Sequence, residues 1–461
     1  MTEDTTKPAP KSAEPPATKE TLLLLAFVFL ASTVGSGTTN ASLTTVMLGA
    51  FLVVGAATPI VSWATGSKSR RTVWLLALAA TGIWRLLAAV DDGRIQQYAQ
   101  RPALLVGVVV VVAASARWLA GSRWLSVVAA VALAVVVIVA GANALSLYSP
   151  PGIDVYYLHE AAADRLAAGM SPYHGLGVED TSPLVGAGAV IDGYPYPPVT
   201  LAIFTLADWV FGDARWAGVL AVAVVVLLLA RSGGTVGRYA ALVLAAAFAA
   251  QPGWLTIVAQ AFTEPVSLAL LAGAVVAWKR PTTAAVLLGL ALASKQYFII
   301  LLPLLLLIPD RHRYRRAATA LGVVFASLLP VLLDLGGFWS SAVEFHLTRS
   351  PRPDSLNLTG FGIEVPTVLL VAISLAAAVF LARGARTAAG FAAAAAATLS
   401  VFFLGTGQAF LNYWFLVAGL AVVAVAARLV EGVPDAEEAS GTGALSAVDL
   451  GGEAVHLIGE T

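Results

Sequence analysis

The chain has 461 residues, of which 59% are hydrophobic and only 12% are charged, and its 27 basic and 27 acidic residues give a formal net charge of zero. Soluble domains carry about 25% charged residues, so this chain has too few charges to cover a soluble surface. Disordered and nucleic-acid-binding proteins are also excluded, because the former need low hydrophobicity and the latter a basic surface. The chain has no cysteine, which excludes thiol catalysis, thiolate metal sites and disulfides. We therefore expect an all-α, polytopic helical membrane protein.

Two polar tails flank the apolar part of the chain. Residues 1–20 are rich in Pro, Thr and charge, and residues 431–461 are acidic, small and rich in Gly. Both compositions are typical of disorder, so we predict two disordered cytoplasmic tails around a transmembrane domain at 21–430. The apolar stretch after Glu20 has no convincing cleavage site and many apolar spans follow it, which favours a retained first helix over a signal peptide.

The apolar segments predict many membrane spans, because a spanning helix needs roughly 20 apolar residues. The region 282–309 is too long for one pass and is interrupted by Ser294-Lys295-Gln296, which predicts two short helices or a re-entrant hairpin meeting near Lys295. In total we expect about 13–15 transmembrane helices. The other candidate spans are 21–38, 41–63, 72–90, 102–120, 124–147, 213–230, 238–253, 262–279, 315–334, 364–382, 387–405 and 411–428.

Lys and Arg in short loops indicate the orientation, since such loops face the cytoplasm. The basic clusters fall in alternate loops only if the apolar segment 197–211 does not fully cross. We therefore interpret 197–211 as a re-entrant or membrane-surface helix on the outer side. The long outer segments are then 148–196 and 335–363, far longer than usual helix connections. Loops of this length indicate a function on the outer face of the plasma membrane.

The first outer segment is acidic and aromatic. Pro150 and Pro151 end the preceding helix, and Asp154 follows at the expected outer membrane boundary. From Leu158 to Ala168 the apolar residues recur at helical spacing, with His159 on the polar face, which predicts an amphipathic surface helix that Gly169 caps. The tyrosines could equally form an aromatic belt at headgroup depth around a solvated carboxylate. These tyrosines are Tyr156, Tyr157, Tyr173, Tyr194 and Tyr196.

The order of residues in 154–198 resembles the signature of a bacterial and archaeal glycosyltransferase family. The matching residues are Asp154-Val-Tyr156-Tyr157, Ala161-Ala162, Leu166, Gly169, Pro172-Tyr173 and Tyr196-Pro197-Pro198. The family is glycosyltransferase family 87, which has the GT-C fold and includes the mycobacterial phosphatidylinositol-mannoside mannosyltransferases. The resemblance implies a GT-C-like enzyme that moves a sugar, with mannose expected, from a polyprenyl phosphate to a lipid or glycan acceptor.

The resemblance also implies a role for Asp154. The family's base is a carboxylate that follows a transmembrane helix in the first large outer loop, and Asp154 matches this position. A hydroxyl acceptor is a poor nucleophile that needs such a base. Inversion at the anomeric carbon needs only this carboxylate, whereas retention would need a second group as nucleophile. We therefore expect an inverting reaction, with nearby side chains of Tyr156, Tyr157, His159, Tyr173 and Tyr196 binding substrate.

The leaving phosphate needs cations, and three basic residues are candidates. Lys295 lies at a helix break, where an ionisable residue indicates function, although a lysine there could also snorkel to the interface. Members of the similar family often carry a Lys-Gln or Lys-Pro pair here, which adds Gln296. Arg349 and Arg352 lie in the second outer segment and are expected to bind an anion. The alternative for these two arginines is a surface salt bridge with Asp354 or Glu344.

Gln260 and Glu264 precede and open the predicted span 262–279. Residues four apart share one helix face, so we expect these two side chains to hold sugar hydroxyls. The alternative is that Glu264 only interacts with the positive end of a helix dipole.

The sequence favours a reaction without metal or cofactor. It contains no phosphate-binding Gly loop and no HExxH motif, and Asp154 has no second acid in the D-x-D or E-x-D sense. The expected partners are a polyprenyl-phosphate sugar, a glycolipid or glycan acceptor and membrane lipids, and not nucleic acid. The alternative function is a transporter or lipid flippase without enzymatic activity, which predicts ionisable residues near the middle of several spans and a pseudo-symmetric layout.

Overall fold

The computed structural model describes residues 19–33, 40–58, 115–116, 118–148, 151, 153–180, 190–232, 237–251 and 253–431. Among these residues the regular secondary structure is helical except for one antiparallel pair of short strands, β1 (Val178–Glu179) and β2 (Val190–Ile191). The all-α class is therefore confirmed. The predicted span 72–90, most of 102–120 and nearly all of both predicted tails lie outside the described residues.

Four described helices are long and apolar enough to cross a membrane, and counting two bent helix pairs as spans raises this number to six. The four are α6 (Arg123–Leu147), α15 (Arg313–Leu328) continued by η2 (Leu329–Leu333), α19 (Ala388–Gly405) and α20 (Leu411–Glu431). The bent pairs are α8 (Pro198–Phe211) with α9 (Trp216–Arg231), and α10 (Arg238–Ala250) with α11 (Gly253–Ala259). Shorter apolar helices are α1 (Lys19–Thr33), α2 (Asn40–Ala57), α12 (Glu264–Val276), α13 (Pro281–Leu292), η1 (Gln296–Leu301) continued by α14 (Leu302–Leu307), and α18 (Thr367–Ala382).

These findings show a helical membrane protein, while the total of 13–15 spans and the GT-C fold stay predictions.

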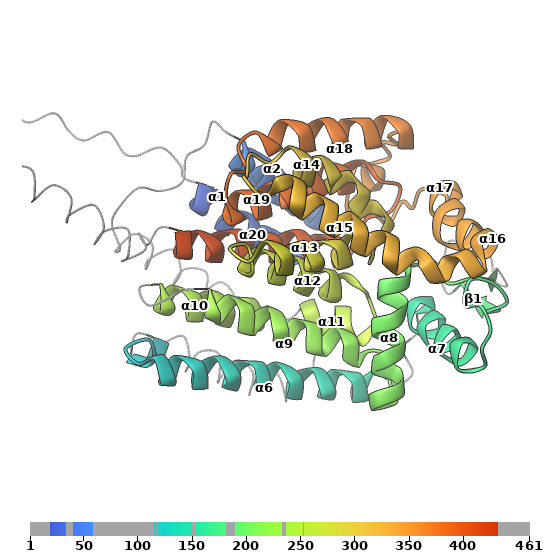
Figure 1. Cartoon of the computed structure of the whole chain (residues 1–461), viewed down its shortest axis with the longest axis horizontal. Helices are drawn as coiled ribbons and strands as arrows, with labels where there is room; N and C mark the ends of the chain where they lie inside the picture. Colours follow the sequence, from blue (N-terminus) through green and yellow to red (C-terminus); the bar gives the residue numbers. More distant parts are fainter. Residues whose placement is uncertain are drawn as a thin grey trace, which may run out of the picture.

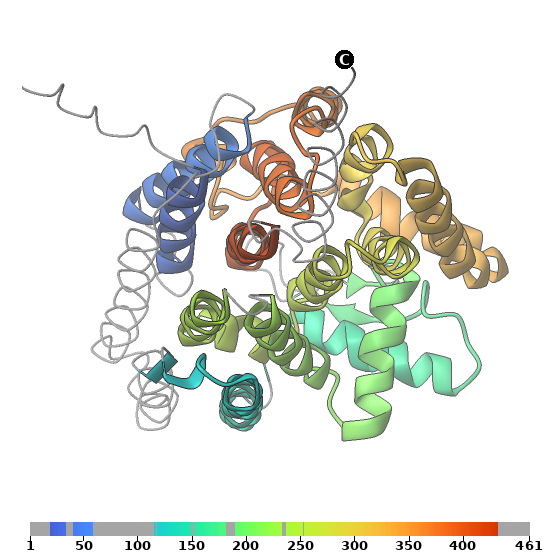
Figure 2. The same cartoon turned by 60° about the vertical axis from the view of Figure 1, so that its left-hand side comes forward.

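Helix α20 lies in the middle of the bundle (Figure 2). It packs against α1, α10, α11, α12 and α19, and almost every residue from Trp414 to Ala427 is buried. Small residues allow this close packing: a Cβ added at Gly419 would lie 2.3 Å from a Leu268 methyl carbon of α12. The bundle core is therefore continuous from α20 to α12, the helix that begins with Glu264.

Helix α8 lies across one end of the bundle, roughly perpendicular to α6 and α9 (Figure 1). The bend between α8 and α9 is 105°, so α8 does not continue as a straight span, in agreement with the re-entrant or surface helix expected for 197–211. Its outward side chains are apolar, and Leu206, Trp209 and Val210 are each about 60% exposed.

The first outer segment contains the predicted amphipathic helix, α7 (Asp154–Ala167). It begins at Asp154, earlier than the predicted Leu158, and Gly169 has a φ of +70°, which confirms the predicted glycine cap. The buried face of α7 packs on α8 and on residues that include Tyr173, Tyr194 and Phe204. This small core holds the N-terminus of α7 against the end of the bundle.

The second outer segment packs on the first at the same end of the molecule (Figure 1). It contains α16 (Leu335–Phe338), the π-helical turn η3 (Trp339–Glu344), α17 (Phe345–Thr348) and the 3₁₀ turn η4 (Leu358–Phe361). Asp334 joins the two segments: its carboxylate accepts hydrogen bonds from the Ser171 hydroxyl and the Gly337 N–H, and lies 2.7 Å from His174 Nδ1. The two long outer segments thus form one layer.

Gly193 is closely packed both within the first segment and against the second. A Cβ at this position would lie 2.3 Å from the Tyr173 carbonyl oxygen and 2.6 Å from the Ser341 Cβ. We expect Gly193→Ala to separate the segments and to destabilise the protein by about 1–3 kcal/mol, the usual cost of overpacking. The measurement is the thermal unfolding midpoint in detergent. Gly322→Ala in α15 is the control, because nothing lies within 4 Å of its added Cβ and Ala favours a helix. Equal midpoints for the two variants would contradict this account of Gly193.

Candidate functional site

Lys295 lies at the predicted helix break and forms a buried ion pair. Helix α13 ends at Leu292, η1 begins at Gln296, and Lys295 between them has extended backbone angles. Its Nζ lies 3.0 Å from Oε1 of Glu264, and the two side chains are 5% and 0% exposed. The break is confirmed, and the structure pairs two of the predicted site residues.

Aromatic rings surround this ion pair. The Lys295 Nζ lies 4.5 Å from the centre of the Tyr196 ring and 5.7 Å from that of Tyr297, within the range of a cation–π interaction. The Tyr297 hydroxyl also donates a long hydrogen bond of 3.4 Å to Glu264 Oε1. The second carboxylate oxygen, Glu264 Oε2, is buried and has no hydrogen-bond partner among the described residues. Besides its own attraction, the ion pair is therefore contacted by the Tyr196 and Tyr297 rings and by one hydrogen bond from the Tyr297 hydroxyl.

Asp154 is the first residue of α7 and its carboxylate is partly buried. Burial and the nearby carboxylate of Asp180 raise its pKa, and this effect exceeds the opposing influence of Arg349, the Val155 N–H and Arg352. The Val155 N–H donates to Asp154 Oδ1 at 2.9 Å. A carboxylate with a raised pKa is a stronger base than a solvated one.

Arg349 and Arg352 both act on Asp154, and each has a carboxylate partner. Arg349 lies 3.7 Å from Asp180, is 25% exposed and stacks on Phe345 at 5.0 Å. Arg352 forms a two-bond pair with Asp354, at 2.9 and 2.5 Å. The alternative of a surface pair with Asp354 therefore holds for Arg352, whereas Arg349 pairs with an acid of the first outer segment. Arg349 is the more accessible candidate for an anion.

Tyr196 lies between two sets of charged residues, Asp154 with Arg349 and Lys295 with Glu264. Burial and then the charges of Glu264 and Asp154 raise the pKa of its hydroxyl well above the usual range, while Arg349 opposes them. One tyrosine thus lies within the electrostatic influence of Glu264, Asp154 and Arg349 and beneath the Lys295 ammonium. The residues predicted from three distant parts of the sequence share one site.

His159 is not on a polar, exposed face as predicted. It is 1% exposed, its ring stacks on Phe204 at 3.9 Å and on Tyr196 at 5.8 Å, and its Nδ1 is hydrogen-bonded to the Tyr194 hydroxyl at 2.8 Å. Burial lowers its pKa to about 3, so the ring is neutral at physiological pH. The prediction was wrong because the buried face of α7, which packs on α8, extends to His159, whereas Asp164 on the predicted polar face is exposed. His159 therefore packs against the Tyr196 ring and helps to fix its position.

Gln296 binds backbone. Its amide nitrogen donates to the carbonyl oxygens of Pro195 at 2.7 Å and Ala342 at 2.8 Å. His346 Nε2 also lies 2.9 Å from the Pro195 oxygen. Gln296 therefore links both outer segments to the helix break and places Tyr196, the next residue after Pro195, over Lys295.

Gln260 and Glu264 do not share a helix face, which corrects the prediction. Helix α11 ends at Ala259, Ala261 adopts a left-handed φ of +57°, and α12 begins at Glu264. The turn separates the two side chains, and only Glu264 forms a described contact with Lys295. The sequence did not reveal this break because the turn contains neither Gly nor Pro between Gln260 and Thr263.

The remaining predicted tyrosines pack around the site. The Tyr156 hydroxyl donates to Glu160, and Tyr157 meets the Tyr156 ring edge-on at 5.3 Å. Tyr173 is buried against Phe338 at 5.1 Å. These tyrosines therefore form part of the wall of the first outer segment, and their predicted contact with substrate stays a prediction.

Arg215 was not predicted as a site residue, although it is 3% exposed and lies between α8 and α9. Both oxygens of Asp213 accept hydrogen bonds from its guanidinium, and its plane lies over the Tyr156 ring at 5.0 Å. The signal that could have revealed it is an arginine on the outer side, where positive charges are disfavoured; it lay inside the predicted span 213–230.

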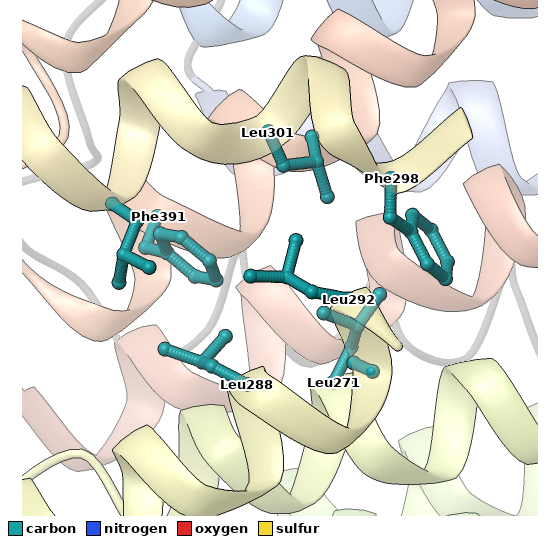
Figure 3. Close-up of a pocket in the computed structure, with 8 residues that line it drawn as sticks. Leu271, Leu288, Leu292, Phe298, Leu301 and Phe391 are labelled. Carbon is teal, nitrogen blue, oxygen red and sulfur yellow. The ribbon is translucent and has the colours of Figure 1, made fainter. Parts of the chain in front are cut away.

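Beyond the helix break lies a small cavity of about 10 Å³ that is lined only by apolar residues (Figure 3). Its walls come from α12, α13, η1, α14 and α19. The pocket contains no charge, so the polar site and this pocket are chemically distinct. The lining residues are Leu271, Leu288, Ala291, Leu292, Phe298, Leu301, Leu305 and Phe391.

No protein-family model matches the chain, and no curated protein and no solved structure matches it either. The resemblance to glycosyltransferase family 87 therefore rests on residues 154–198 themselves. Within the part of the chain that the structure describes, no group of three His, Cys, Asp or Glu side chains could hold a metal ion.

A double-mutant cycle tests the buried pair. We expect Lys295→Met to destabilise the protein by about 3–5 kcal/mol, because it leaves the Glu264 charge buried without a counter-ion. Adding Glu264→Gln should recover part of this loss, since the uncompensated charge is removed. The measurement is unfolding in detergent for both single variants and the double variant. Asp354→Asn is the control, because a partly exposed pair contributes about 0–1 kcal/mol. Additive losses for Lys295 and Glu264 would mean that the two side chains are not coupled.

Proposed function

We propose that the protein is an integral-membrane glycosyltransferase acting on the outer face of the plasma membrane. It moves a sugar, with mannose expected, from a polyprenyl-phosphate donor to a hydroxyl of a lipid or glycan acceptor. The observation that carries the proposal is a single site in which a carboxylate of raised pKa, Asp154, is within electrostatic range of a partly exposed arginine, Arg349. The family resemblance of residues 154–198 supports the same reaction.

Asp154 acts as the general base in this proposal. It takes the proton of the acceptor hydroxyl as the oxygen forms a bond to the anomeric carbon. The bond between that carbon and the phosphate oxygen breaks on the opposite side, and the polyprenyl phosphate leaves with the electron pair. A single carboxylate is enough for this inverting displacement, and a metal ion is not required by the scheme.

Positive charge stabilises the departing phosphate in two ways. Arg349 is 25% exposed and has a long ion pair, so a phosphate could replace Asp180 as its partner. Lys295 is buried, stays paired with Glu264 and lies over the Tyr196 ring, so it acts on the phosphate only from a distance. Preorganised charges of this kind are usually the largest contribution to catalysis.

The alternative function is a transporter or lipid flippase. One observation favours it: a buried Lys–Glu pair lies at a discontinuous helix, and discontinuous helices form the binding sites of many transporters. Movement of a lipid-linked sugar across proteoliposomes without any new glycosidic bond would favour this alternative.

Removing the base should stop the reaction. We expect Asp154→Asn to lower the turnover number about 10²- to 10⁴-fold, the usual contribution of a general base. The measurement is product analysis by mass spectrometry, with purified protein and a panel of polyprenyl-phosphate sugars. Asp164→Asn, an exposed position on the same helix, is the matched control and should retain activity. Full activity of Asp154→Asn would overturn the proposed role.

The charges around Asp154 should set the acidic limb of the pH–activity profile. The base must be ionised, so activity falls as the pH drops through the raised pKa of Asp154. Asp180 raises this pKa and Arg349 lowers it. We therefore expect Asp180→Asn to move the acidic limb to lower pH and Arg349→Met to move it to higher pH. Profiles of kcat/KM against pH measure both shifts, and shifts of the same sign would contradict the assignment.

A further inference from the structure

Arg215 is a buried cation that the proposed reaction does not use. It precedes α9 at the corner where the chain turns by 105° from α8. Its Nε contacts both oxygens of Asp213 at 3.0 Å, and its second terminal nitrogen donates to Asp213 at 2.6 Å. With its charge balanced by Asp213 and its side chain 3% exposed, Arg215 is unsuited to binding a substrate anion.

The other contacts of Arg215 are with the chain segments that lead to Asp154 and to Glu264. One terminal nitrogen donates to the carbonyl oxygen of Tyr148 at 2.7 Å and to that of Ala259 at 3.4 Å. Tyr148 caps the end of α6, shortly before Asp154, and Ala259 ends α11, shortly before Glu264. One guanidinium therefore connects the segment leading to the proposed base with the segment leading to the buried ion pair.

The face of the guanidinium makes a third connection. It lies 5.0 Å from the Tyr156 ring, in the first turn of α7, and the Tyr156 hydroxyl donates to Glu160 in the next turn. The N-cap residue of α7, Ile153, provides no side-chain hydrogen bond to the helix. The Arg215–Tyr156 stack thus fixes the first turn of α7 from the side.

We propose that Arg215 is a positioning residue. It holds the first turn of α7, and with it Asp154, at a fixed position relative to the Glu264–Lys295 pair. The catalytic part of this inference rests on the proposed function, whereas the positioning itself does not. Only an arginine fits the role, because one planar guanidinium serves a carboxylate, two carbonyl oxygens and an aromatic face at once.

The chain offers a closely matched control in Arg316. This residue is 2% exposed, is paired with Asp310, donates to the Trp278 carbonyl oxygen and lies 3.9 Å from the Trp278 ring centre. It has the same three kinds of partner as Arg215. It lies beyond the far end of α12, at the opposite end from Glu264.

The test compares Arg215→Lys with Arg316→Lys by hydrogen–deuterium exchange and by kinetics. In Arg215→Lys, the amides of 154–160 and 256–262 should exchange faster than in the wild type, and those of 313–320 should not. At saturating donor the turnover number per folded molecule should fall about 100-fold with little change in KM, the loss typical of a 1 Å misplacement near a reacting group. Arg316→Lys should alter exchange only around 313–320 and retain turnover.

A second variant keeps the inference testable if Arg215→Lys does not fold. Tyr156→Leu removes both the contact with Arg215 and the hydrogen bond to Glu160, whereas Tyr156→Phe removes only the hydrogen bond. Exchange in 154–160 should therefore rise more in Tyr156→Leu than in Tyr156→Phe, and exchange in 256–262 should stay unchanged in both. Wild-type exchange in 154–160 for Arg215→Lys, or a loss of turnover that only follows the folded fraction, would overturn the inference. Absence of sugar transfer by the wild type would instead overturn the proposed function, and the exchange data would still decide whether Arg215 positions α7.

Discussion

The end of the bundle that carries α7 and α8 depends on one constraint, that backbone groups released where helices break must find hydrogen-bond partners in apolar surroundings. The protein meets it with side-chain donors that each serve two carbonyl oxygens from other parts of the chain. Every such donor therefore joins segments that are far apart in sequence, and the broken helix ends become fixed points. These donors and acceptors are Gln296 with Pro195 and Ala342, Arg215 with Tyr148 and Ala259, and Asn357 with Phe403 and Thr406.

Because the Gln296 side chain binds the backbone carbonyl groups near the break, the Lys295 ammonium is not needed for them. It contacts Glu264 and the Tyr196 ring instead. An ion pair this deeply buried contributes little net stability, since removing both charges from water costs about as much as their attraction returns. An apolar pair of similar volume would hold α12 against η1 equally well. The presence of charges here is therefore better explained by an electrostatic role than by stability. Oε2 of Glu264, which has no hydrogen-bond partner in the part of the chain that the structure describes, agrees with this view.

The sequence predicted the features that depend on local chemistry. A lysine between two apolar runs predicted the helix break, and Gly169 after an amphipathic stretch predicted the end of α7, because each signal acts over a few residues. Features that depend on tertiary contacts were not predictable. His159 was assigned to a polar face because only the packing of α8 buries it, and the carbonyl partners of Gln296 were not foreseen because they lie 101 and 46 residues away. Arg215 was overlooked for the same reason: its partners come from α6, α7 and α11.

The ion pairs also determine how an incoming phosphate would be received under the proposed function. Replacing one partner of a partly exposed ion pair by a phosphate costs about 0–1 kcal/mol, the contribution of such a pair. Breaking a buried ion pair costs about 3–5 kcal/mol. The 3.7 Å pair of Arg349 with Asp180 lies between the two kinds, because Arg349 is 25% exposed and Asp180 only 7%, whereas the 3.0 Å pair of Lys295 with Glu264, at 5% and 0%, belongs to the second. A phosphate would therefore replace Asp180 at Arg349 while Lys295 keeps its partner. Because Arg349 also lowers the pKa of Asp154, neutralising it with phosphate would raise that pKa and make the base stronger at the moment the donor is bound.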